Sequence, residues 1–154
     1  MVFFRSQQSK QKKRAPACVQ KGTMVYAVGD IHGRLDLLKE IQEKIKKDAD
    51  NHKNASKVIV YLGDYIDRGL HSKEVIEHLS KKPLHGFESI YLKGNHEIAM
   101  QLFLDSPKET GSWLLWGGDA TLQSYNISLR DEKGKKYDLE QLADALKKAI
   151  PENH

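Results

Sequence analysis

The feature that most constrains the fold is a repeat of three apolar runs, each followed directly by a polar, glycine-containing stretch and then by a helical pattern. The three stretches are Gly29-Asp30-Ile31-His32-Gly33, Gly63-Asp64-Tyr65-Ile66-Asp67-Arg68-Gly69 and Gly94-Asn95-His96-Glu97. Asp30 and Asp64 are 34 residues apart, and Asp64 and Asn95 are 31 residues apart. This is the length of one strand–helix–strand unit. The sequence therefore predicts an α/β fold in which the stretches meet at the carboxyl end of neighbouring parallel strands, where open sheets bind ligands.

The apolar pattern also predicts where the elements lie. Buried strands are expected over 23–28, 57–62 and 87–92, because these runs are short, continuous and rich in β-branched residues. Helices are expected from residue 34, from an N-cap at Ser72, and after Asn95. The segment 112–118 fits either a core helix that ends at a glycine or a wall beside a substrate. A last helix is expected from a capping box at Asp138 and Gln141 to Pro151.

Composition separates a tail from one domain. Residues 1–21 hold six basic residues and no acidic one, which leaves 19 basic against 21 acidic residues in the rest of the chain. We expect residues 1–22 to be a disordered basic tail and residues 23–154 to form a single domain. No apolar run is long enough for a membrane span, and no secretory signal is recognised, so a membrane partner is not expected. The single cysteine, Cys18, suits a cytoplasmic location.

The polar stretches carry the residue types of a two-metal phosphoesterase site. Asp30 and His32 are two residues apart, so both can face one ion, while Asp64 can bridge two ions and Asn95 can offer a neutral oxygen to the second. Two ions about 3.5–4 Å apart can hold the attacking and the leaving oxygens of a phosphate ester and activate the attacking water.

Three further residues have the properties of catalytic and phosphate-binding groups. His96 follows Asn95 directly and is a candidate proton donor to the leaving oxygen. Asp67 can hold the imidazole of His96 in one tautomer. Arg68 can bind phosphate oxygens with its planar guanidinium.

The three motifs resemble those of the metallophosphoesterase superfamily, in particular the serine/threonine protein phosphatase branch found in bacteria and phages. The resemblance covers about residues 24–126. It implies the αββα sandwich of calcineurin-like phosphoesterases, of which this chain would hold mainly the N-terminal βαβαβ half. It also implies metal ligation by Asp30, His32, Asp64 and Asn95, with manganese, iron or zinc as the ions. Lys93 stands where many relatives have a phosphate-binding arginine, so it is a candidate for the same contact.

By this resemblance we expect a metal-dependent hydrolase acting on phosphoserine or phosphothreonine in proteins. The alternatives are a hydrolase of symmetrical dinucleoside tetraphosphates and an inactive remnant that binds a metal or a partner. Asp67 favours the protein phosphatase, because nucleotide hydrolases of the family often lack an acidic residue there. A phosphoprotein or a phosphorylated small molecule is the expected substrate, and nucleic acid is not expected as a partner.

One departure from the family pattern concerns length. Relatives continue with a second sheet and two further histidines of the second metal site, and nothing after Asn95 resembles those strands. We therefore expect this chain to be the N-terminal part of a phosphatase, with its other half supplied elsewhere. The first sheet should then expose apolar surface, and the chain alone should associate and show weak or no activity.

Overall fold

The structure is a computed structural model that describes residues 18–151. Its elements in chain order are β1 (Thr23–Val28), α1 (Leu35–Ala49), β2 (Ser56–Tyr61), α2 (Ser72–Lys81), β3 (Glu88–Tyr91), α3 (Asn95–Asp105), α4 (Pro107–Thr110), the 3₁₀ helix η1 (Gly111–Trp116), α5 (Gly118–Ser124) and α6 (Leu139–Ala149). Residues 1–17 of the predicted tail lie outside the described residues.

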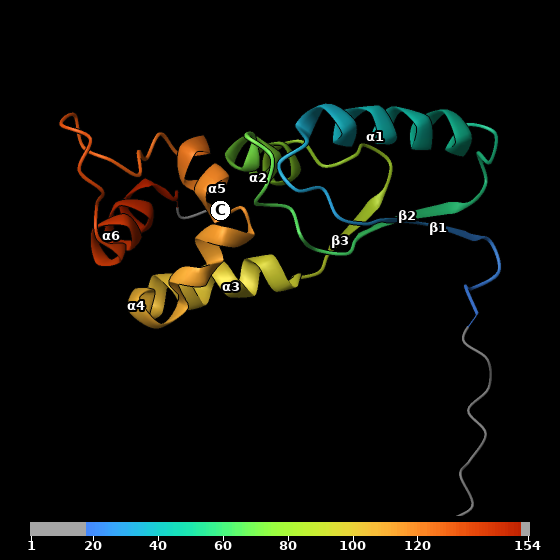
Figure 1. Cartoon of the computed structure of the whole chain (residues 1–154). Coiled ribbons are helices and arrows are strands. Elements are labelled where there is room, and N and C mark those ends of the chain that lie inside the picture. The colour runs from blue at the N-terminus through green and yellow to red at the C-terminus, as the bar shows by residue number, and fades with distance from the viewer. Residues whose placement is uncertain (1–17, 152–154) are drawn as a thin grey trace, which may run out of the picture.

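The three strands form one parallel sheet in the order β1-β2-β3, as the sequence pattern predicts. Val28 is paired with Tyr61, and Tyr61 with Tyr91, so the strands end at the same level. The loops that follow them therefore leave the sheet at one edge. Helices α1 and α2, which connect the strands, lie on the same face of the sheet (Figure 1).

A first core cluster fills the space between the sheet and these two helices. Ile59 and Tyr61 of β2 are buried there against Leu38 of α1 and Val75 of α2. These helix residues belong to the apolar stripes that the spacing of three and four predicts. On α2 the buried apolar stripe consists of Val75 and Leu79, and its burial holds this helix against the sheet.

The opposite face of the sheet is apolar and partly exposed. Val25 pairs with Val58, and Val60 pairs with Ile90, so these side chains share a face. Val25 is 45% exposed and Ile90 is 40% exposed. No described helix covers this face in Figure 1. The expectation of exposed apolar surface on the sheet is confirmed for the described part of the chain.

The helices after β3 build a second core cluster beside the sheet. Its largest fully buried side chains are Phe103 of α3, Trp113 of η1, Leu122 of α5 and Leu146 of α6. Helix α5 packs against α2, which joins this cluster to the sheet layer. Helix η1, which contains Trp113, ends at a glycine as one interpretation of the sequence predicts. This residue, Gly117, has a left-handed φ of 105°.

Two details of the helix ends differ from expectation or refine it. Ser72 is not the N-cap of α2; His71 has that position, and the Ser72 hydroxyl instead accepts the backbone N–H of Asp67 at 3.1 Å. The capping box of α6 is confirmed, since Asp138 and Gln141 exchange side-chain-to-backbone hydrogen bonds. Among the described residues, no helix is both long enough and apolar enough to cross a bilayer.

Candidate functional site

The loops after β1 and β2 are joined by backbone hydrogen bonds. The first loop (residues 29–34) donates the N–H groups of Ile31 and His32 to the carbonyl of Asp64, both at 2.9 Å. The second loop (residues 62–71) returns a bond from the Gly69 N–H to the carbonyl of His32. Gly33 has a φ of 63°, and a Cβ there would meet the backbone of Gly69, so this approach requires glycine.

The second loop is joined in the same way to the third loop (residues 92–97). Glu97 accepts the backbone N–H of Asp64 at 2.9 Å and that of Tyr65 at 2.8 Å. The Asp64 carboxylate accepts the backbone N–H of His96 at 3.0 Å in return. Gly63, with a φ of 103°, lies so close to the backbone of Gly94 that a Cβ would overlap it. All three polar stretches therefore meet in one place.

Backbone strain is concentrated at this place. Positive φ angles are unusual for residues other than glycine, and His32, Asp64, Asp67 and Arg68 have values of 46°, 53°, 73° and 65°. Such conformations cost about 1–3 kcal/mol each and persist where the surroundings fix them. Here the hydrogen bonds between the loops supply that constraint.

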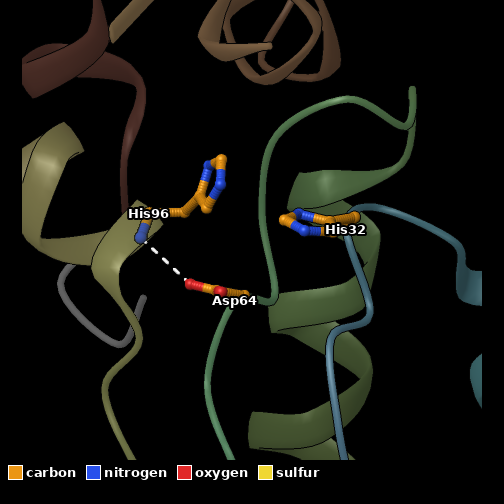
Figure 2. Close-up of side chains that lie close together, drawn as sticks. All are labelled: His32, Asp64 and His96. Carbon is orange, nitrogen blue, oxygen red and sulfur yellow. Dashed lines mark hydrogen bonds between the residues drawn. The ribbon is translucent and has the colours of Figure 1, made fainter. Parts of the chain in front are cut away.

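The centre of the site is a cluster of possible metal ligands. His32, Asp64 and His96 each offer one ligand atom, and these atoms lie within 4.8 Å of one another. The two imidazole rings lie edge to face, with their centroids 4.7 Å apart, and Figure 2 shows the Asp64 carboxylate below both of them. Imidazole nitrogen and carboxylate oxygen together suit manganese, iron or zinc, so the donor set fits the expected ions.

The tautomer of His32 suits a ligand role. Its Nδ1 lies 2.9 Å from the carbonyl oxygen of Ile66, which can only accept, so Nδ1 is the donor and the neutral ring offers the lone pair of Nε2. That Nε2 lies 3.7 Å from a carboxylate oxygen of Asp30. Asn95 is exposed at the start of α3, next to His96. The structure thus brings all four predicted metal ligands to one end of the sheet, while their individual roles stay predictions.

His96 and Asp67 form a buried pair beside the cluster. The Nδ1 of His96 lies 2.7 Å from the Oδ2 of Asp67, whose side chain is 0% exposed. Burial raises the pKa of Asp67 above its ordinary value, against hydrogen bonds from Thr121, His96 and Trp113 that lower it. The Nε2 of His96 is left to face the guanidinium of Arg68 at 3.4 Å. The Asp67 carboxylate therefore fixes the orientation of the imidazole, while the roles predicted for both residues stay predictions.

An open cavity of about 640 Å³ adjoins this pair, lined by Arg68, Asn95, His96, Leu115, Trp116 and Gly117. Its apolar side includes Leu115, which is 87% exposed. The backbone N–H of Arg68 donates to the carbonyl of Gly117 at 3.0 Å, which fixes that side against the second loop. The interpretation of segment 112–118 as a wall therefore fits its exposed residues, and the core interpretation fits the buried Trp113.

Lys93 is not brought to this cavity. Its ammonium donates to the side-chain oxygen of Gln101 on α3 at 2.9 Å, and it borders a different hollow. The phosphate contact that the resemblance implies for Lys93 therefore stays a prediction that this geometry does not favour.

Three residues with clear roles in the site were not recognised from sequence. Glu97 satisfies loop N–H groups, while Trp113 and Thr121 donate hydrogen bonds to Asp67. For Glu97 a signal exists, because it occupies the N3 position of α3, where a glutamate often reaches back to the start of the helix. For the other two no local signal exists, since their partner is 46 and 54 residues away.

Comparison with known proteins agrees with this arrangement. The sequence profile described as calcineurin-like phosphoesterase matches residues 23–151. A similar curated protein is the asymmetrical bis(5′-nucleosyl)-tetraphosphatase PrpE of Halalkalibacterium halodurans, which is 36% identical over 76 residues. The match covers 45% of this chain and 29% of PrpE, so the chain spans less than a third of that relative. Since the family profile extends from the first strand past the last helix, the chain belongs to the calcineurin-like phosphoesterase family.

Proposed function

We propose that this chain provides the catalytic loops of a metal-dependent phosphoesterase that hydrolyses phosphoserine and phosphothreonine in proteins. The observation that carries the proposal is the buried Asp67–His96 pair, 2.7 Å apart, next to the ligand cluster and Arg68. A carboxylate-held imidazole beside metal ligands can protonate the oxygen that leaves phosphorus.

The metal ions would be held by Asp30, His32, Asp64 and Asn95. When bound, such ions polarise phosphoryl oxygens and lower the pKa of the water that attacks phosphorus. Because the Nδ1 of His32 is engaged by the Ile66 carbonyl, its Nε2 is the atom available to an ion.

The remaining groups would act on the substrate itself. Arg68 lines the cavity and can bind phosphoryl oxygens in pairs with its guanidinium. His96, as an imidazolium, would give its Nε2 proton to the leaving alkoxide while Asp67 accepts the Nδ1–H, which leaves the ring as the neutral Nδ1–H tautomer. Protonation of the leaving oxygen matters most for serine and threonine, whose alkoxides are strongly basic.

A second candidate is the hydrolysis of dinucleoside tetraphosphates. It is supported by the name of the relative PrpE, an asymmetrical tetraphosphatase, whereas the family resemblance implies a symmetrical one. The exposed Leu115 and Trp116 beside Arg68 offer apolar surface for the organic part of either substrate.

A single set of assays separates these functions. The chain is incubated with Mn²⁺ and, in turn, p-nitrophenyl phosphate, a phosphoserine peptide and diadenosine tetraphosphate. Release of phosphate from the peptide supports the protein phosphatase. Hydrolysis of diadenosine tetraphosphate alone supports the second candidate, and the products distinguish symmetrical cleavage (two ADP) from asymmetrical cleavage (AMP and ATP).

Counting bound Mn²⁺ per chain tests the third possibility. Two bound ions would support an intact site, while one ion or none would support the remnant. We further propose that the exposed face of the sheet takes another layer of polypeptide, which would complete the site.

A cytoplasmic location is part of the proposal, supported by the single free cysteine Cys18.

A further inference from the structure

The carboxylate of Asp67 has more hydrogen-bond donors than the proposed proton transfer requires. Its Oδ2 accepts two hydrogen bonds, from the Nδ1–H of His96 at 2.7 Å and from the indole N–H of Trp113 at 2.8 Å. Its Oδ1 accepts the hydroxyl of Thr121 at 2.7 Å. Of these donors, only His96 borders the cavity. Trp113 and Thr121 therefore act on the site through Asp67, without contact to a substrate.

These hydrogen bonds restrict the Asp67 carboxylate to one orientation. A carboxylate held by a single bond can turn about its side-chain axes, but here both oxygens are engaged by donors on three elements, α3, η1 and α5. Thr121 also accepts the backbone N–H of Asp67 at 2.9 Å, so it holds both ends of this residue. That backbone has a φ of 73°, which requires support from its surroundings.

Trp113 is itself firmly placed. It is 1% exposed, and its ring lies 4.9 Å from that of Phe103 in the second core cluster. Gly118 lies against the indole so closely that a Cβ there would overlap the ring. The helical cluster after β3 thus fixes the indole N–H, and the indole N–H fixes Asp67.

We propose that Trp113 and Thr121 are positioning residues for the proton donor, which hold Asp67 so that its Oδ2 keeps His96 in the Nδ1–H tautomer with Nε2 toward the cavity. The effect on rate rests on the proposed phosphoesterase function; the effect on His96 does not. Since a general acid contributes about 10²–10⁴-fold, partial misplacement is expected to cost about tenfold in kcat.

The variants isolate the hydrogen bonds from packing. Trp113→Phe keeps an aromatic ring but removes the N–H, and Thr121→Val keeps the shape but removes the hydroxyl. Thr121→Ser restores the hydroxyl and is the rescue variant. Phe103→Leu disturbs the same core cluster without removing a bond to Asp67, and is the matched packing control.

The first readout is the histidine nitrogen NMR spectrum of the full chain, with His96 assigned by its loss in His96→Gln. We expect a single Nδ1–H tautomer of His96 in the unchanged chain, in Thr121→Ser and in Phe103→Leu. Trp113→Phe and Thr121→Val should shift or broaden the Nδ1–H signal. An identical His96 signal in all five proteins would overturn the proposal. If Trp113→Phe does not fold, the Val and Ser variants of Thr121 decide the matter.

The second readout is kcat for two substrates with different leaving groups. Trp113→Phe and Thr121→Val should lower kcat for a phosphoserine peptide about tenfold, and far less for p-nitrophenyl phosphate, whose leaving group needs little protonation. An equal loss for both substrates would show a merely structural role and overturn the proposal. If the unchanged chain turns over neither substrate while the NMR differences hold, the proposed function fails and the positioning role stands.

Discussion

One carboxylate oxygen of Glu97 accepts the backbone N–H of Asp64 at 2.9 Å, and this bond joins helix α3 to the second loop. The same oxygen accepts the N–H of Gly94 at 2.8 Å, and the other oxygen accepts that of Tyr65 at 2.8 Å. The second oxygen also accepts the N–H of Ile66 at 3.4 Å, so one side chain satisfies four backbone donors where the chain leaves two strands. We infer that Glu97 sets the distance between the second and third loops.

Replacement of Glu97 by Gln should destabilise this junction. The amide keeps one acceptor, but its NH₂ group would face N–H donors and leave at least one of them unsatisfied. A buried donor without a partner costs about 1–3 kcal/mol, so we expect the free energy of unfolding to fall by about that amount. Urea unfolding measures it, with Glu132→Gln, an exposed position, as control. Equal stability of both variants would show that the loop does not depend on Glu97.

Asp64→Asn should weaken metal binding without loss of the fold. Its Oδ1 accepts the N–H of His96, and an amide oxygen can keep that bond. The negative charge next to His32 is lost, and we expect the affinity for Mn²⁺ to fall by at least about tenfold. Calorimetric titration with Mn²⁺ measures the change. Asp36→Asn removes an exposed carboxylate paired with Arg34 and should leave the affinity unchanged. The same affinity in both variants would mean that Asp64 holds no ion.

The strands and the meeting of the loops were predictable because each rests on local pattern plus one topological rule. Strand β1 (Thr23–Val28) has the expected bounds. Both ends of β2 and both ends of β3 lie within one residue of the expected position. Parallel strands with helical connections must end at the same edge, so Asp30, Asp64 and Asn95 had to meet there.

The surroundings of Asp67 were not predictable in this way. Its bonds to Trp113 and Thr121 depend on how the helices after β3 fold back, and no spacing in the sequence encodes that. Ser72 was misjudged for the same reason, because a tertiary contact to Asp67 outweighed its preference for an N-cap position. Helix α5, which begins with Gly118 after the left-handed Gly117, carries weak helical signals and was missed.

Arg68 and Lys93 should differ in their effect on substrate binding. Arg68 borders the cavity beside His96, whereas the ammonium of Lys93 is bonded to Gln101 and borders another hollow. We expect Arg68→Met to raise KM for p-nitrophenyl phosphate about tenfold, equivalent to ~1.4 kcal/mol. Lys93→Met should change KM much less. Steady-state kinetics in the presence of Mn²⁺ decides, and a larger effect at Lys93 would mean that its side chain turns to the phosphate in the working enzyme.

The exposed sheet face should cause the chain to self-associate. Val25 and Ile90 lie on the face that no described helix covers, and contiguous apolar surface of this kind favours association. Replacing both by Thr keeps β-branched side chains in the strands and should shift the molecular mass from light scattering toward the monomer. Leu37→Gln, which removes an exposed apolar residue from α1, should not. Unchanged association after the double replacement would place the contact elsewhere.

Stability should fall in alkaline solution, partly because of Tyr125. Burial, together with the charges of Glu77 and Glu74, raises the pKa of this phenol to about 12. The unfolded chain releases the proton near its ordinary value of about 10. The contribution to stability is therefore complete below pH 10 and is lost as the pH rises from there toward 12, because only the unfolded state is then ionised.

Tyr125→Phe tests this linkage, since phenylalanine keeps the ring that packs in the second core cluster and lies 5.8 Å from the ammonium of Lys73. We expect the free energy of unfolding in urea to decline less steeply between pH 9.5 and 11 than in the unchanged chain, with the difference between the two growing with pH. Tyr137→Phe, at an exposed position, is the matched control and should follow the unchanged chain. Parallel curves for Tyr125→Phe and the unchanged chain would mean that Tyr125 ionises equally in the folded and unfolded states, and that burial does not hold its proton.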